Sequence, residues 1–174
     1  TVPRARVTYK AWWPDALGRT TGTADFGTNG GSLLVRPETL PARTDVVLVE
    51  LSVYNGRGEL FKTIDPAGRE DRMSFDDAGR RTAFIENYVD GDPTSGGTDQ
   101  DRTTTWTYTP DGNIATIAAV NSGTGTQTTT YVYGTTLAES GVAMSTLLKY
   151  QIYPDSTGTD DRVLFSYNRQ QDVV

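Results

Sequence analysis

One segment of the sequence carries oxygen-bearing side chains at the spacing of a calcium-binding loop. Asp90, Asp92, Thr94 and Asp101 would occupy positions one, three, five and twelve of such a loop. The segment departs from the calcium pattern at two places, because position six is Ser95 instead of glycine and position twelve is aspartate instead of glutamate. Two interpretations follow, a weak calcium site and a solvated hairpin tip, and the sequence favours the tip.

The residue types that most catalytic and transition-metal sites need are missing. The sequence contains no histidine and no cysteine, which removes the usual general base, the thiol nucleophile and the zinc ligands. Ser145 and Lys149 do not stand in the motif of a serine–lysine nucleophile, so we interpret them as surface residues. We expect no catalytic residue, no bound cofactor, no metal apart from the calcium alternative, and no enzyme activity.

A pair of carboxylates is the remaining candidate for a catalytic site, because a glycosidase needs only two carboxyl groups at a fixed separation. The acidic candidates mostly stand where a turn already needs a short polar side chain: Asp65, Asp76, Asp77, Asp111, Asp160 and Asp161. We therefore interpret them as turn residues.

These carboxylates belong to a six-residue turn cassette that recurs along the chain. Most copies begin with an aromatic or apolar residue, continue with Asp, Asn or Thr, and carry glycine at position five. The copies lie at residues 14–19, 54–59, 64–69, 75–80, 108–113 and, in a degenerate form, 167–172. Position two can accept a hydrogen bond from the backbone two residues on, proline pre-sets a turn angle, and the glycine takes the left-handed conformation. The residues assigned to these turns are Asp15, Gly18, Gly58, Asp65, Pro66, Gly68, Asp76, Gly79, Pro110 and Gly112.

The spacing of the cassettes predicts short strands between the turns. Consecutive cassettes begin at residues 54, 64 and 75, which leaves strands of about five or six residues, the usual length in globular sheets. The residues between them alternate in polarity as half-buried strands do. The predicted fold class is therefore all-β, built from antiparallel β-hairpin repeats.

The rest of the chain is expected to support this array. Residues 1–20 are predicted to form a strand, a turn and a returning strand, and residues 21–44 a long surface connection. An apolar strand is expected over 46–54. Residues 88–102 and 153–162 share a Gly-Thr-Asp core followed by Asp-Arg, which predicts two equivalent hairpin tips on one edge of the sheet. A short helical turn or irregular crossover is expected within 137–149, the one stretch of helical character.

The aromatic residues have two interpretations, a sugar-binding platform or cross-strand packing, and their recurrence at fixed places in the repeat favours packing. They are Trp12, Trp13, Tyr54, Phe75, Trp106, Tyr108, Tyr131, Tyr133, Tyr150, Tyr153 and Tyr167.

The charge of the chain limits its partners. A formal net charge of −6 argues against nucleic acid and against an anionic membrane surface. The first residues form neither a signal-peptide core nor an initiator methionine, so we interpret residues 1–174 as a single repeat segment of a longer protein.

The run from Tyr54 to Arg69, continued by residues 75–82, resembles the YD repeats of RHS-repeat proteins. The family pattern is a tyrosine–aspartate pair, a Gly-Arg, and then Asp-Pro-x-Gly one hairpin later. Proteins of this kind include shell components of bacterial toxin complexes, polymorphic Rhs toxins and teneurins. The resemblance implies hairpins wound into a spiralling sheet that forms a hollow shell, which in the bacterial toxins encloses a toxic polypeptide.

The function implied by the resemblance is structural. The chain would be part of a secreted or cell-surface bacterial shell, with neighbouring repeats of the same polypeptide and an enclosed toxin or other cargo polypeptide as its partners. The alternative is a cell-surface adhesin module that binds carbohydrate or protein through exposed aromatic residues. Aromatic side chains stacked within the sheet would favour the shell, and a row exposed on one face would favour the adhesin.

Shells of this family often cleave themselves after an Asp-Pro-x-Gly-Leu element that is followed by an Asn-Pro signature. Residues 65–68 match the start of this element, but Arg69 replaces the leucine and no Asn-Pro follows. We therefore expect no self-cleavage here.

Overall fold

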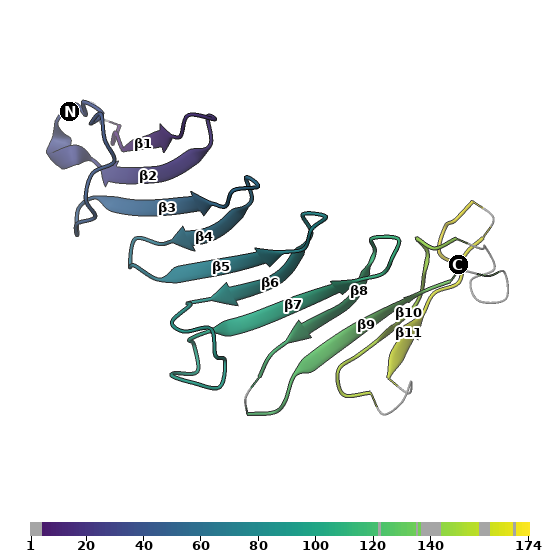
Figure 1. The fold of residues 1–174 in the computed structure, drawn as a ribbon. Helices are drawn as coiled ribbons and strands as arrows, with labels where there is room; N and C mark the ends of the chain where they lie inside the picture. The colour runs from purple at the N-terminus through teal and green to yellow at the C-terminus, as the bar shows by residue number, and fades with distance from the viewer. Residues whose placement is uncertain (1–4, 122, 135, 137–143, 157–160, 169) are drawn as a thin grey trace. The chain divides into compact units, whose positions relative to one another are not determined.

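The structure is a computed structural model that describes residues 5–121, 123–134, 136, 144–156, 161–168 and 170–174. Within these ranges the predicted all-β class is confirmed. Eleven antiparallel strands are arranged in the sheet in the order of the sequence, and the only other element there is a short 3-10 turn, η1 (Asn29–Gly31) (Figure 1). The strands are β1 (Tyr9–Pro14), β2 (Thr20–Gly27), β3 (Leu48–Tyr54), β4 (Leu60–Ile64), β5 (Glu70–Phe75), β6 (Arg81–Glu86), β7 (Arg102–Tyr108), β8 (Ile114–Ala119), β9 (Gln127–Tyr133), β10 (Leu148–Ile152) and β11 (Arg162–Leu164).

Two compact units divide the chain, residues 1–73 and residues 74–174. The first unit contains β1 to β4 and the beginning of β5, and the second contains β6 to β11. The single repeat segment expected over 1–174 stays a prediction. In the described residues, no helix is long and apolar enough to cross a membrane.

The first unit has a small apolar core on one face of its sheet. Ala11 of β1, Ala24 of β2 and Val49 of β3 stand opposite one another in the strand register and are buried. Trp13 lies on the same face and is buried beside them. Side chains alternate between the faces of a strand, so the residues between these positions lie on the other face.

The segment that connects β2 to β3 covers this core. The indole Nε1–H of Trp13 donates to the carbonyl of Pro37 over 3.2 Å, and Leu40 packs against the buried residues. Gly22 of β2 makes room for Leu40, because a Cβ at Gly22 would lie 2.5 Å from a methyl carbon of that leucine. The expected surface connection over 21–44 is therefore wrong for 21–27, which continue β2, and the connection begins after Gly27.

The second unit is built from hairpins without a comparable core. Its strands are half-buried, and no apolar side chain in its described part reaches the burial of Trp13 or Val49 in the first unit. Cross-strand side chains contribute instead, as in the 2.6 Å hydrogen bond between the hydroxyls of Thr107 and Thr116. Sheet stability there depends on strand pairing and on contacts at the turns.

Two expectations fall partly outside the described residues. Most of the predicted helical stretch, 137–143, lies outside them, and the rest of it is a turn followed by the start of β10. The hairpin tip at 153–162 is described except for 157–160. The loops after β6 and β10 lie at the same edge of the second unit's sheet, because the intervening strands alternate in direction.

Candidate functional site

The turn cassettes share one backbone hydrogen-bond pattern. The N–H of position two donates to the carbonyl of position six, and the N–H of position five donates back to the carbonyl of position two. In all six cassettes these N···O distances are between 2.8 and 3.0 Å. The degenerate copy at 167–172 therefore closes in the same way as the others.

Position five is in the left-handed region in every cassette. The φ angles there are 80° at Gly18, 86° at Gly58, 88° at Gly68, 77° at Gly79, 87° at Gly112 and 70° at Gln171. Glycine adopts this conformation without steric penalty, whereas Gln171 has to hold a side chain in it.

The side chain at position two binds both the backbone and the side chain of position six. In the cassette at 75–80, Oδ1 of Asp76 accepts the N–H groups of Ala78 and Arg80 over 3.0 and 2.9 Å. Its Oδ2 accepts Nε of Arg80 over 2.8 Å and forms an ion pair with the same guanidinium. Asp15 with Arg19 repeats this arrangement, and Asp65 with Arg69 repeats its position-six contacts.

Two cassettes make the same link with the chemical roles reversed. Asn55 accepts the N–H of Glu59 at Oδ1, and its Nδ2 donates to the Glu59 carboxylate over 2.6 Å. Asn168 and Asp172 form the same pair, with 3.2 Å between the amide nitrogen and the carboxylate. Positions two and six thus covary within this chain, Asp with Arg and Asn with an acidic residue.

These contacts stabilise the ionised aspartates. The hydrogen bond from the Arg19 side chain holds the pKa of Asp15 below its usual value, and Arg80 does the same for the pKa of Asp76. At Asp65 partial burial raises the pKa, but the hydrogen bonds from Arg69 outweigh it and the pKa is lowered. The ionised carboxylate is thus the form that accepts the hydrogen bonds of the turn.

Two of the three cassette prolines, Pro66 and Pro110, occupy position three, whereas Pro14 is at position one of its cassette. Pro66 and Pro110 both follow the position-two residue, and the carbonyl of Pro66 accepts a hydrogen bond from the guanidinium of Arg43 over 3.1 Å. Pro66 and Pro110 thus hold the first corner of their turns, where a fixed φ is compatible with the backbone.

Tyrosine hydroxyls connect successive hairpins. Each of four tyrosines donates to the carbonyl at the start of a neighbouring strand or hairpin: Tyr54 to Thr20 (3.1 Å), Tyr108 to Arg81 (2.6 Å), Tyr133 to Ile114 (2.9 Å) and Tyr167 to Leu148 (2.8 Å). Tyr54, Tyr108 and Tyr167 stand directly before a cassette turn, and all four tyrosines make this contact within their own unit. These four hydroxyls therefore fix the strands that carry them to the preceding hairpin.

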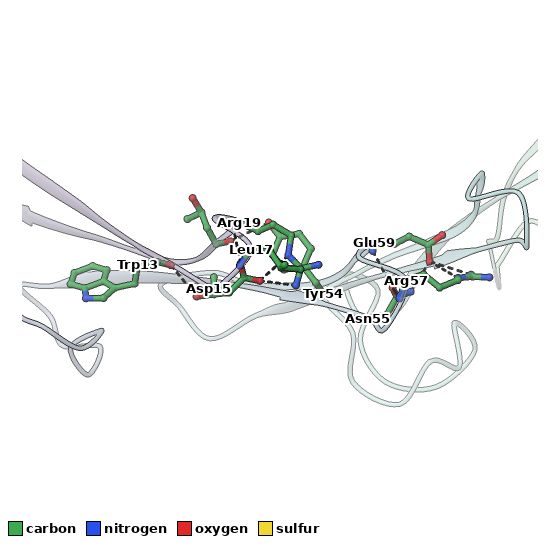
Figure 2. A network of polar contacts seen from close by, with 10 residues as sticks. Trp13, Asp15, Leu17, Arg19, Tyr54, Asn55, Arg57 and Glu59 are labelled. Atoms are coloured by element: carbon green, nitrogen blue, oxygen red, sulfur yellow. Dashed lines mark hydrogen bonds and ion pairs between the residues drawn. The ribbon is translucent and has the colours of Figure 1, made fainter.

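In each unit, an arginine at position six joins this link. The guanidinium carbon of Arg19 lies 4.4 Å from the ring centroid of Tyr54, and Arg80 lies equally far from the ring of Tyr108. Figure 2 shows Asp15, Arg19 and Tyr54 next to one another, with the following turn continuing through Asn55 and Glu59. A carboxylate, a guanidinium and an aromatic ring thus follow one another from one cassette to the next.

The calcium candidates in the loop after β6 bind the loop's own backbone. Asp101 is only 1% exposed, and its Oδ1 accepts the N–H groups of Val89 and Gly91, each over 2.9 Å. Burial alone would raise the pKa of Asp101, but these N–H donors outweigh it and the pKa is lowered. Asp101 itself has a left-handed φ of 50°.

The other candidates of that loop are engaged in short-range contacts. Asp90 accepts the hydroxyl of Ser95 and the N–H of Asp92, while Asp92 accepts the N–H and the hydroxyl of Thr94, at 2.8 and 2.6 Å. Across the part of the chain that the structure describes, no group of three or more acidic, histidine or cysteine side chains is placed to hold a metal ion. The candidate side chains thus serve as acceptors for the loop's own N–H and hydroxyl groups, and the choice between hairpin tip and calcium site stays a prediction.

Three of the remaining acidic and nucleophile candidates have structural contacts within the described part of the chain. Asp65 and Asp76 are each paired with the arginine of their own turn. Burial and the neighbouring Asp155 raise the pKa of Asp161, which is exposed at its hairpin tip, and Asp160 lies outside the described residues. The backbone carbonyl of Ser145 accepts a hydrogen bond from Asn113.

Most aromatic side chains are engaged within the sheet. Of the aromatic residues named as candidates, Trp12 and Tyr153 are exposed, with exposed fractions of 56% and 38%, and the others are buried or half-buried. Trp12 and Tyr153 belong to different units, so the described aromatics of neither unit form an exposed row. The sequence did not reveal the tyrosine hydroxyl links or the pairing of positions two and six, although the covariation of the latter is visible in it.

Comparison with known protein families finds no match, and no curated protein matches the chain. Among solved structures, the chain is similar to the crystal structure of TcdB2-TccC3-Cdc42, with 16% identity, a TM-score of 0.40 and 92% of this chain covered. It is also similar to TcdB2-TccC3-TEV (15%, 0.41, 95% covered) and to the Photorhabdus luminescens Tc holotoxin pore (15%, 0.41, 96% covered). In each case this chain spans 9% of the other chain.

Proposed function

We propose that the chain is a structural segment of a YD-repeat shell that helps to enclose or present a polypeptide cargo, of the toxin-delivery type, and that it is not an enzyme. The observation that carries this proposal is the chain of contacts from carboxylate to guanidinium to tyrosine between consecutive hairpins. Asp15, Arg19 and Tyr54 form it in the first unit, and Asp76, Arg80 and Tyr108 form it in the second.

In the second unit, the contacts at the turns replace what the buried core supplies in the first. An isolated two-stranded hairpin is only marginally stable in water, and a single sheet needs further support. In the second unit the described side chains leave both faces of the sheet half-exposed. Because the contacts at the turns support the sheet from one edge, both of its faces stay open to other molecules. This arrangement suits a wall that has to face a cargo on one side.

The partners under this proposal are neighbouring repeats and an enclosed cargo. The outer sides of β1 and β11 have no strand paired with them in the described residues, and such edges pair readily with further strands. Repeat arrays are stabilised in this manner through nearest neighbours. The protein would act outside the bacterial cytoplasm, as part of a longer secreted or cell-surface polypeptide.

The test is cargo protection in the longer polypeptide that carries residues 1–174. A reporter polypeptide placed as its cargo is expected to survive proteinase K in the wild type. Replacing Arg19 and Arg80 together by alanine removes both guanidinium links, so digestion of the reporter is expected to accelerate. An alanine at Arg6, which precedes β1, is the matched control and should leave protection unchanged. Equal digestion of the reporter in the wild type and as free polypeptide would overturn the proposal.

The non-catalytic part of the proposal has its own test. Asp65 is held ionised by Arg69 and closes a turn, so neither it nor its Asn variant should cleave the backbone. Intact-mass measurement after prolonged incubation is expected to give the full chain for both proteins. Specific scission that disappears in Asp65→Asn would show that this aspartate is catalytic.

A further inference from the structure

A mixed polar and aromatic hollow lies on the uncovered face of the first unit. Trp12 of β1, Thr23 of β2 and Glu50 of β3 are opposite one another in the register, on the face away from the buried core. The adjacent row on the same face contains Lys10, Asp25 and Leu48. Together with Ala24 and Pro66, these six residues line a hollow of about 260 Å³.

The charges in this hollow are unbalanced by one carboxylate. Lys10 is paired with Asp25, with 3.2 Å between the ammonium and the carboxylate. Glu50 accepts only a 3.3 Å hydrogen bond from the hydroxyl of Thr23, and no described cation is paired with it. The site therefore carries one negative charge that the described part of the chain leaves without a cation.

The three tryptophans of the chain differ in whether a cation lies over the ring. The guanidinium of Arg81 lies 4.4 Å from the ring centroid of Trp106, and that of Arg36 lies 5.8 Å from the ring of Trp13. No described cation lies over Trp12, which is 56% exposed. Its ring face is thus open to a ligand from outside the described chain.

We propose that this hollow binds the guanidinium of an arginine side chain from a partner polypeptide. Neighbouring strands are about 4.8 Å apart, so Trp12 and Glu50 are about 10 Å apart, with the small Thr23 between them. A planar guanidinium above Thr23 contacts the indole with its face and donates N–H groups to the Glu50 carboxylate.

The chain's own cassettes contain the same trio in complete form. At Asp15, Arg19 and Tyr54 a guanidinium stands between a carboxylate and an aromatic ring. The hollow offers the carboxylate and the ring and lacks the guanidinium. The net charge of −6 also favours a basic partner segment. This inference does not depend on the proposed shell function, because an adhesin could use the same site.

The test uses the whole 174-residue chain labelled with ¹⁵N and N-acetyl-arginine methylamide as the probe. Nuclear magnetic resonance resolves the three indole N–H signals. The signal that disappears in Trp12→Phe is that of Trp12. Saturable movement of the Trp12 signal is expected, while the signals of Trp13 and Trp106 stay in place. Glu50→Gln should weaken the affinity about threefold, as for an exposed ion pair. Glu38→Gln, which removes an exposed carboxylate from the covering segment, should leave it unchanged.

Two further ligands decide the chemistry of the site. N-acetyl-citrulline methylamide has the shape of the probe without its charge, and it should leave the Trp12 signal unmoved at the same concentration. Methyl β-glucopyranoside should also leave it unmoved. The proposal is overturned if the citrulline compound moves the Trp12 signal as far as the arginine compound does, or if the glucoside moves it and the arginine compound does not. It is also overturned if the three indole signals move together, or if Glu50→Gln binds the arginine compound as tightly as the wild type does.

Discussion

The guanidinium carbon of Arg80 lies 4.4 Å from the centre of the Tyr108 ring, and the hydroxyl of the same tyrosine donates to the carbonyl of Arg81. The ring is therefore held at its face by one residue and at its hydroxyl by the next. Arg19 and Thr20 hold Tyr54 identically in the first unit. At these two turns, the position-six arginine and the residue after it thus hold the tyrosine of the neighbouring hairpin.

Replacing Tyr108 by phenylalanine tests the hydroxyl contact alone, because the ring and its stacking on Arg80 are kept. The free energy of unfolding is expected to fall by about 1 kcal/mol, the usual net contribution of one hydrogen bond. Urea denaturation measures it. Tyr153→Phe is the control, because Tyr153 is exposed, and an equal loss there would contradict the assignment.

The pairing of positions two and six is tested by exchanging it at Asp65 and Arg69. Asp65→Asn places an amide donor against the guanidinium, and Arg69→Glu places two carboxylates together, so each change alone should destabilise the chain by about 0.5 kcal/mol. The double change recreates the pair of Asn55 and Glu59 and should recover most of the loss. Thermal denaturation of the four proteins gives the coupling energy, and purely additive effects would refute the pairing.

The stability of the fold should fall in acid within a defined window. The pKa values of Asp15 and Asp76 are lowered by the hydrogen bonds of their arginines. The unfolded chain, in which an aspartate has a pKa of about 3.9, binds protons first, so this stabilisation is complete above that pH and is lost as the pH falls through the folded values.

The urea midpoint as a function of pH measures this effect. It should be nearly flat between about pH 7 and 5 and should decrease below about pH 4. The decrease should be shallower in Asp76→Asn, which has no carboxyl group to protonate. A midpoint that rises on acidification through this window would be incompatible with the lowered pKa values.

Asp101 is expected to be the most sensitive residue of the loop after β6. Asp101→Ala leaves the N–H groups of Val89 and Gly91 without their acceptor and should cost about 1–3 kcal/mol. Asp101→Asn keeps one acceptor oxygen and tolerates the left-handed backbone, so it should cost less. Hydrogen exchange of the two amides is the readout, and unchanged protection in the alanine variant would show that the carboxylate is dispensable.

Gly79 tests the backbone of the cassette. Its φ of 77° disfavours any side chain, so Gly79→Ala should reduce the free energy of unfolding by about 1 kcal/mol. Gly56 lies at position three of the cassette at 54–59, has no positive φ itself and has open space around it, so Gly56→Ala should change stability by less than about 0.5 kcal/mol. Chemical denaturation compares the two variants, and equal effects would mean that the left-handed conformation is not required.

The turns could be predicted from the sequence because their chemistry is local. Six consecutive residues contain the acceptor at position two, the glycine at position five and the partner at position six, so spacing alone reveals them. The strand at 20–27 was missed because Gly22 resembles a turn residue, and its reason for being glycine is Leu40, 18 positions away. Such a contact is visible only after folding.

The links between hairpins were beyond sequence analysis for the same reason. Arg19 and Tyr54 are 35 positions apart, whereas Arg80 and Tyr108 are 28 apart, because the loops between them differ in length. No fixed spacing marks the pair. Asp101 was ambiguous in another way, since a carboxylate that gathers backbone N–H groups and one that gathers a calcium ion occupy similar loops.

Both members of every position-two and position-six pair come from the same turn. A gene duplication or deletion that adds or removes a whole hairpin therefore carries its charges in matched sets and leaves no orphaned aspartate or arginine behind. Where the neighbouring strand ends in a tyrosine, as at Tyr54 and Tyr108, the position-six arginine of the turn also has an aromatic partner. A change by one whole hairpin would thus keep every position-two and position-six contact within the turn that it closes.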